Sequence, residues 1–210
     1  MDSHQITIAT YNSVAKIYQD KFMDLDIYNH TYDSFLKFLD NSNATIFEIA
    51  CGPGNIARYL LSKKPTLIIS GIDPAVNMVE LANANNPTAR FSVMDCRDIE
   101  QLTEKYDAIV CGFCMPYISK AECEKLIKDC HQLLQSGGIL YCSTMEGDYA
   151  TSGFETNCAG NTIYIYYHEE AYLKNALLNY NFEILEFTRQ PYTKSDGSMV
   201  NDLFFISRKK

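Results

Sequence analysis

The chain lacks several features that would assign it to a class at once. No stretch approaches the roughly 18 apolar residues that a membrane-spanning helix needs, and no membrane partner is expected. The first twenty residues lack the apolar core of a secretory signal, which favours a cytoplasmic location. Basic residues are in deficit, because 18 Lys and Arg face 26 Asp and Glu, giving a formal net charge of −8. This balance argues against a broad nucleic-acid interface, which needs a basic face.

Motifs of several enzyme classes are also missing. There is no H-E-x-x-H sequence and no pair of closely spaced metal-ligand sets, so we expect no metal site. The eight cysteines are scattered through expected strands and helices, which indicates reduced thiols rather than a disulfide scaffold.

What the chain does contain is a regular alternation of strand and helix patterns. With 210 residues and 47% hydrophobic content, it is long enough for one globular domain. Helical periodicity at 9–20 and 28–39 precedes this alternation, and two late strands without a helix between them predict an antiparallel edge. We therefore expect an α/β fold with a mostly parallel, doubly wound seven-stranded sheet and helices on both faces. The expected strands span 45–50, 67–72, 90–94, 106–111, 139–144, 182–189 and 203–207.

Polar residues follow the ends of the expected strands, where ligands bind in open α/β sheets. Gly52 after the first strand allows the backbone to turn tightly and to approach a ligand. Asp73 after the second strand is suited to accept hydrogen bonds from two ribose hydroxyls. Asp95 after the third strand suits the exocyclic amine of an adenine, and Met78 and Phe113 offer apolar surface.

Glu48 distinguishes between two kinds of ligand for this loop. The sequence from Gly52 to Ala57 also fits the loose G-x-G-x-x-G/A fingerprint of dinucleotide-binding proteins. An acid just before the loop would repel a pyrophosphate, by about 1 kcal/mol at 4 Å in water and roughly 4 kcal/mol at an effective dielectric of 20. The same acid would attract an ammonium group. The residues therefore favour an adenosine that carries a cationic tail.

Five motifs in this order resemble those of the class I S-adenosylmethionine-dependent methyltransferases. They occupy residues 48–54, 71–78, 94–98, 106–117 and 133–140, and residues 11–18 resemble a helix that covers the cofactor in many small-molecule members. The resemblance implies a Rossmann-like fold and S-adenosyl-L-methionine as the cofactor. It divides the single domain 1–210 into an N-terminal helical lid (1–40), a cofactor-binding core (41–145), and a substrate-side insertion with closing strands (146–210).

The resemblance also assigns roles to single residues. The methionine part would be bordered by Glu48, Ala50, Gly52 and Asn55. The ribose would bind Asp73, in the segment that includes Pro74 and Met78, and the adenine would meet Asp95 and Cys96. Backbone near the amino group would come from Cys111 and Gly112, while Tyr11 and Tyr18 would close over the cofactor.

The implied reaction is an in-line attack of a substrate nucleophile on the sulfonium methyl group. His168 is the candidate general base, because its ordinary pKa suits proton transfer near neutrality, although a helix-capping role is the alternative. Cys114-Met115-Pro116-Tyr117 lacks the acid or amide of the motif typical of base-methylating enzymes, which favours a small-molecule acceptor. A non-catalytic S-adenosylmethionine-binding module, an NAD-dependent reductase and an aminopropyl transferase remain as alternatives.

Overall fold

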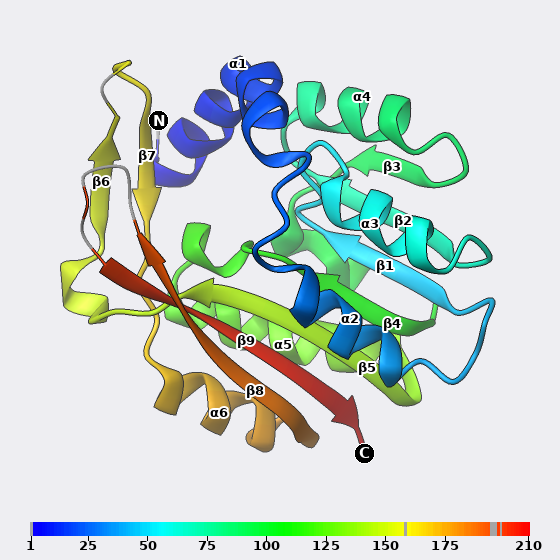
Figure 1. The fold of residues 1–210 in the computed structure, drawn as a ribbon. Coiled ribbons are helices and arrows are strands. Elements are labelled where there is room, and N and C mark those ends of the chain that lie inside the picture. Colours follow the sequence, from blue (N-terminus) through cyan, green and yellow to red (C-terminus); the bar gives the residue numbers. More distant parts are fainter. Residues whose placement is uncertain (1, 158, 194–196, 198) are drawn as a thin grey trace.

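The computed structural model describes residues 2–157, 159–193, 197 and 199–210. Its centre is a seven-stranded sheet in the order β3-β2-β1-β4-β5-β9-β8 (Figure 1). The order reverses between β1 and β4, as in doubly wound folds, so the carboxyl ends of these strands frame a crevice. The strands are β1 (Thr45–Ile49), β2 (Ile68–Asp73), β3 (Arg90–Val93), β4 (Tyr106–Cys111), β5 (Leu134–Met145), β8 (Phe182–Thr193) and β9 (Met199–Lys209).

Strand direction follows the connections between the strands. The five strands joined through helical segments pair in parallel, whereas β9 pairs antiparallel with both β5 and β8. No helix separates β8 from β9, and a direct connection of this kind requires antiparallel neighbours. The predicted fold class, including the antiparallel edge, is confirmed. Several strand boundaries differ, most of all in β5, which begins at Leu134, immediately after the preceding helix, rather than at Ile139.

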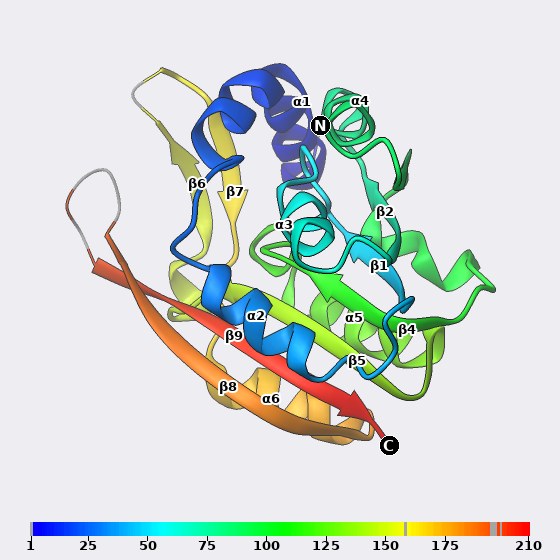
Figure 2. The same cartoon turned by 45° about the vertical axis from the view of Figure 1, so that its right-hand side comes forward.

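Helices cover both faces of the sheet (Figure 2). One face carries α2 (Asn29–Lys37), α3 (Asn55–Lys63) and α4 (Val76–Asn85), and the other carries α5 (Lys120–Leu133) and α6 (Glu170–Asn179). The start of α5 is fixed by the predicted capping box, in which Ser119 and Glu122 satisfy each other's backbone N–H groups. Each helix thereby buries an apolar stripe against the sheet and leaves the strand ends free.

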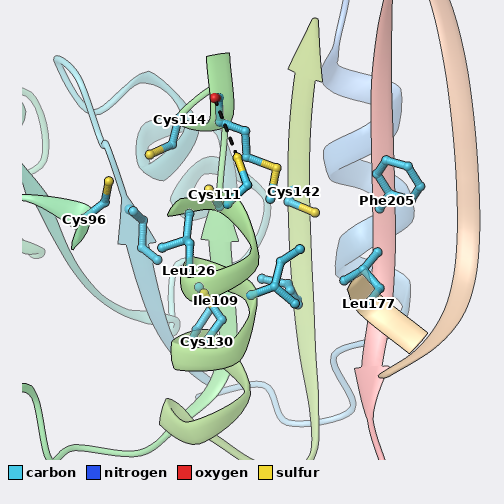
Figure 3. Close-up of a cluster of buried hydrophobic side chains, with 14 of the residues drawn as sticks. Cys96, Ile109, Cys111, Cys114, Leu126, Cys130, Cys142, Leu177 and Phe205 are labelled. Carbon is cyan, nitrogen blue, oxygen red and sulfur yellow. Dashed lines mark hydrogen bonds between the residues drawn. The ribbon is translucent and has the colours of Figure 1, made fainter. Parts of the chain in front are cut away.

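Cysteine thiols contribute to the packing between the sheet and α5. Cys111 on β4, Cys130 on α5 and Cys142 on β5 lie among Ile109 and Leu126 in one apolar cluster (Figure 3). The seven cysteines that the structure describes are free and buried, as the prediction of reduced thiols requires. Burial raises the pKa of the Cys142 thiol to about 12, so it packs as a small apolar group.

Segments outside the sheet gather at the edge toward which β1, β4 and β5 point (Figures 1 and 2). They are α1 (Ser3–Phe22), the two-stranded hairpin β6 (Gly153–Thr156) and β7 (Thr162–Ile165), and three short 3₁₀ turns, η1 (Cys96–Gln101), η2 (Met115–Tyr117) and η3 (Tyr149–Thr151). Helix α2 does not join them, because its residues Phe35 and Leu36 pack into the core between this helix and the face of the sheet. Of the expected lid region, only α1 therefore lies over the strand ends.

Candidate functional site

The loop after β1 turns through left-handed backbone at three positions. Ala50, Gly52 and Gly54 have φ of 55°, 52° and 80°, a region that L side chains rarely adopt. A Cβ on Gly54 would lie 2.3 Å from the Asn86 side chain, so glycine at this position allows the end of α4 to approach the turn. The loop ends in Asn55, the first residue of α3.

Glu48 is a buried acid without a partner. Its side chain is 2% exposed, and neither carboxylate oxygen has a hydrogen-bond partner among the residues that the structure describes. Burial raises the pKa of Glu48 to about 8, the nearby amide of Ala57 lowers it only in part, and the charge of Asp73 raises it further. A buried carboxylate in this state lacks the donor that such groups almost always have. An ammonium group would supply that donor.

Asp73, the last residue of β2, holds two parts of the crevice together. Its carboxylate accepts hydrogen bonds from the backbone N–H groups of Gly52, at 3.0 Å, and Ala75, at 2.8 Å. Burial raises the pKa of Asp73 to about 6, and the two amides only partly counter this effect. The side chain is thus fixed in place at the lip of the cavity, where adjacent hydroxyl groups could donate to it.

Asp95 follows β3 and is fully paired. It accepts hydrogen bonds from His4 Nε2, at 2.8 Å, and from the Arg97 guanidinium, at 2.7 Å. Burial alone would raise the pKa of Asp95, but these two partners hold it well below its usual range. The same contact raises the pKa of His4, although burial opposes the effect. Helix α1 is therefore tied to the third strand end through one ion pair.

These strand ends and α1 line a partly open cavity. Six of the predicted cofactor residues line it: Tyr11, Ala50, Asp73, Pro74, Met78 and Cys96. Tyr18, Glu48, Gly52, Asn55, Asp95, Cys111 and Gly112 lie outside this lining. Among these, Gly52 lies against the Tyr18 ring. A Cβ added at Gly112 would clash with the Ile56 side chain. The predicted residues thus lie in one region, and the cavity is on the side of those predicted to bind the adenosine.

Aromatic rings from α1 form the roof. The Tyr11 hydroxyl bonds to that of Tyr117 in η2, and the ring of Tyr18 lies edge-on to Tyr11 at 5.7 Å. Met78 and Ala75 pack beneath these rings. This arrangement fits the expectation that the N-terminal helix covers the site.

Sequence reasoning missed the first turns of α1. His4, Thr7 and Ile8 line the cavity, yet the periodicity predicted a helix only from residue 9. Asp2 was the signal in the sequence, because aspartate is a favoured N-cap residue. In the structure its side chain accepts a hydrogen bond from the backbone N–H of Gln5.

His168 does not face the cavity. It is 0% exposed, its Nε2 donates to the carbonyl oxygen of Met115 at 2.8 Å, and its Nδ1 accepts from the Tyr172 hydroxyl at 2.7 Å. Burial lowers the pKa of His168 to about 4, although the Met115 carbonyl partly counters it. Both ring nitrogens are occupied by the fold, so this geometry does not support the predicted general base. The two hydrogen bonds of His168 instead connect η2 to α6.

The described part of the chain offers neither a metal site nor a membrane-spanning helix. There, no three His, Cys, Asp or Glu side chains are grouped so that they could hold a metal ion. None of the described helices combines the length and apolar character needed to cross a bilayer.

Comparison with known proteins relates this chain to a family. The family model of the methyltransferase domain matches residues 46–138, which run from β1 to the start of β5. The predicted family resemblance is confirmed.

Individual relatives extend the match. A putative methyltransferase 235L of Invertebrate iridescent virus 6 is 32% identical over 126 residues, covering 57% of this chain and 46% of the viral protein. The malonyl-[acyl-carrier protein] O-methyltransferase of Priestia megaterium is 28% identical over 151 residues, covering 69% of this chain and 53% of that protein. The chain thus spans about half the length of these relatives.

Solved structures share the fold over nearly the whole chain. A magnesium protoporphyrin IX methyltransferase from Synechocystis, with S-adenosylhomocysteine bound, superposes with a TM-score of 0.74 at 17% identity and covers 100% of both chains. The [4+2]-cyclase SpnF gives a TM-score of 0.75 at 14% identity, covering 99% of this chain and 96% of its own. A methyltransferase fold therefore accompanies more than one kind of chemistry.

Proposed function

We propose that this protein transfers a methyl group from S-adenosylmethionine to a small-molecule acceptor. The observation that carries the proposal is the unpartnered, buried carboxylate of Glu48 beside the glycine turn. Leaving such a group unpaired is costly, so its retention is explained by a ligand that brings an ammonium group. A pyrophosphate, which an NAD-dependent reductase would place here, would be repelled.

Three carboxylates follow the order of the ligand's parts. Glu48 near the end of β1 would hold the amino group, Asp73 at the end of β2 the ribose hydroxyls, and Asp95 after β3 the adenine. Met78 and Cys96 line the cavity between the last two and offer apolar surface. Backbone of Gly52 and Gly112 would border the tail of the cofactor.

The cofactor would supply an electrophilic methyl group, so the chain's own task is to bind, orient and exclude water. The roof formed by Tyr11 and Tyr117 separates the cavity from solvent on the α1 side. We assign no proton transfer to His168, because both of its nitrogens are held by other groups.

A small acceptor fits the coverage of the site. Helix α1 and the β6–β7 hairpin are packed together over the strand ends, and Thr10 on α1 bonds to the Thr162 carbonyl at 2.6 Å. A macromolecule would have to displace this pair of elements, whereas a metabolite needs only a local opening. The relatives whose names state a substrate, such as the malonyl-[acyl-carrier protein] enzyme, leave the identity of the acceptor here open.

Binding of the demethylated cofactor is the first test. S-adenosylhomocysteine at a hundredfold excess over its dissociation constant should stabilise the fold by about 2.7 kcal/mol. For a chain of this size the melting temperature should rise by roughly 5–10 °C, at about 2–4 °C per kcal/mol. NAD should give no shift, because Glu48 opposes its pyrophosphate. An unchanged melting temperature with S-adenosylhomocysteine would overturn the proposal.

A methyl-transfer screen against a metabolite library separates an enzyme from a non-catalytic binding module. Labelled methyl from S-adenosylmethionine should appear in at least one acceptor. Tight cofactor binding with no transfer to any compound would favour the binding module.

A further inference from the structure

A second buried acid lies at the same edge of the sheet, beyond the cofactor cavity. Asp202 is 2% exposed and pairs in the β5–β9 ladder with Met145, the last residue of β5. Because β9 runs antiparallel to β5, its first residues lie where the parallel strands end. Asp202 is therefore two strands from β4, or about 10 Å at the usual strand spacing. Because the cavity is lined by residues that follow β1, β2 and β3 together with residues of α1, an acceptor would approach from this side.

The Asp202 carboxylate is only half satisfied. Its Oδ2 accepts a hydrogen bond from the Tyr28 hydroxyl at 2.6 Å, while its Oδ1 accepts none among the residues that the structure describes. Burial raises the pKa of Asp202, and the Tyr28 bond offsets this only in part. Tyr28 lies at the start of α2, which runs beside β9 in Figure 2. One acceptor site of the Asp202 carboxylate thus remains available.

Aromatic rings surround the acid. The Tyr28 ring lies 5.2 Å from that of Phe113 and 5.3 Å from that of Phe204, and both Tyr28 and Phe113 are only half-buried. Phe113 has φ of 52° and is held there by its N–H bond to Ser143 Oγ at 2.9 Å. Burial raises the pKa of Tyr117, on the cavity wall, to about 12, and the charge of Asp202 contributes. The acid and the cavity therefore share one electrostatic neighbourhood.

We propose that Asp202, presented by Tyr28, is the polar anchor of the acceptor subsite, and that it selects an aromatic ring carrying a hydroxyl or amino hydrogen. The half-buried rings of Tyr28 and Phe113 provide flat apolar contacts, while the free carboxylate oxygen requires a donor. This inference rests on the proposed methyl-transfer function, because it names the acceptor class for that same site.

A second tyrosine–aspartate pair in the chain supplies a matched control. Tyr59 on α3 donates to Asp33 on α2 at 2.8 Å, but this pair joins two helices on a face of the sheet, remote from the strand ends. It makes the same kind of hydrogen bond as Tyr28 and Asp202, although Asp33 is only half-buried whereas Asp202 is 2% exposed. Replacing both members by apolar groups of similar shape leaves no buried orphan in either case, so both double variants are expected to fold.

The experiment uses the full chain loaded with S-adenosylhomocysteine. Calorimetry first measures the affinity for S-adenosylhomocysteine, then for phenol, aniline and anisole, in the wild type, the double variant Y28F/D202L and the control Y59F/D33L. Anisole matches phenol in its ring but has no hydrogen to donate. We expect the wild type and the control to bind phenol or aniline at least tenfold more tightly than anisole, and Y28F/D202L to lose this preference.

The possible outcomes distinguish the proposed function from the role of Asp202. Failure of S-adenosylhomocysteine to bind the wild type would overturn the proposed function and this inference together. Normal cofactor binding with an equal preference for phenol in Y28F/D202L would overturn the role of Asp202 alone. Wild-type protein that binds none of the three rings, or binds anisole as well as phenol, would overturn the acceptor class.

Discussion

The two ends of the proposed cofactor site differ in electrostatic state. At the proposed methionine end, Glu48 is buried without a hydrogen-bond partner, and burial raises its pKa to about 8. At the proposed adenine end, Asp95 is held by His4 and Arg97, and its pKa lies below the usual range despite burial. Both acids lie near the same sheet edge, yet Glu48 lacks a partner and Asp95 has two.

A ligand would therefore add a new interaction at Glu48, whereas at Asp95 it would compete with hydrogen bonds that the protein already makes. An ammonium group arriving at Glu48 would meet a carboxyl group with no side-chain donor to displace, so the interaction, less the cost of removing the proton below pH 8, appears as binding energy. An adenine amine arriving at Asp95 would instead share a carboxylate already occupied by α1. The methionine end should therefore control affinity, while the adenine end should couple the cofactor to the lid helix.

The largest effect is expected from Glu48→Gln. Loss of the negative charge opposite a buried ammonium should cost about 3–5 kcal/mol, which is at least a hundredfold in S-adenosylhomocysteine affinity. Calorimetry measures the loss directly. Asp129→Asn is the matched control, because Asp129 is a buried acid on α5 that pairs with Lys125 at 2.7 Å, away from the cavity. Equal affinity in Glu48→Gln and the wild type would remove Glu48 from the site.

The ligand-free protein should also show the state of Glu48 in its pH dependence. A carboxyl whose pKa is about 8 when folded and 4.5 when unfolded binds more protons in the folded state between these values. The free energy of unfolding should therefore fall as pH rises through this window, by roughly 2–3 kcal/mol from pH 5 to pH 7 for this one group.

The comparison with Glu48→Gln isolates that contribution from those of other acids. The stability of the Gln variant relative to the wild type should increase with pH, as measured by denaturant unfolding at pH 5, 6 and 7. Saturating S-adenosylhomocysteine should remove the trend in the wild type, because an ammonium partner keeps Glu48 ionised. A stability difference that stays constant from pH 5 to 7 would mean that Glu48 is not buried in a protonated form.

Local sequence predicted the methionine end better than the adenine end. Glu48, Gly52 and Asp73 lie on or directly after buried strands, so strand pattern and loop chemistry were enough to bring them together. The partner of Asp95 could not be found in this way, because His4 is 91 residues away and reaches it only through the packing of α1. The same holds for Tyr28 and Asp202, which are 174 residues apart.

His168 illustrates the opposite error. A histidine next to a helix start is compatible with catalysis by its ordinary pKa alone, but its actual properties follow from burial against Met115 and Tyr172. Those contacts depend on where η2 and α6 meet in space. The residue type alone is compatible with proton transfer, but tertiary packing leaves neither ring nitrogen of His168 available for it.

The smallest effect, and the finest probe of the difference between the two ends, is expected from His4→Phe. Phenylalanine keeps a ring against the cavity but cannot donate to Asp95, so an adenine amine would no longer compete with α1 for the carboxylate. Adenosine, which lacks the methionine tail, should bind up to about fivefold more tightly, corresponding to the roughly 1 kcal/mol net value of one hydrogen bond. S-adenosylhomocysteine should gain by the same factor, since Glu48 is untouched. Weaker binding of adenosine to the variant, measured by calorimetry, would show instead that His4 supports the ligand and that the adenine end is also built to be completed by it.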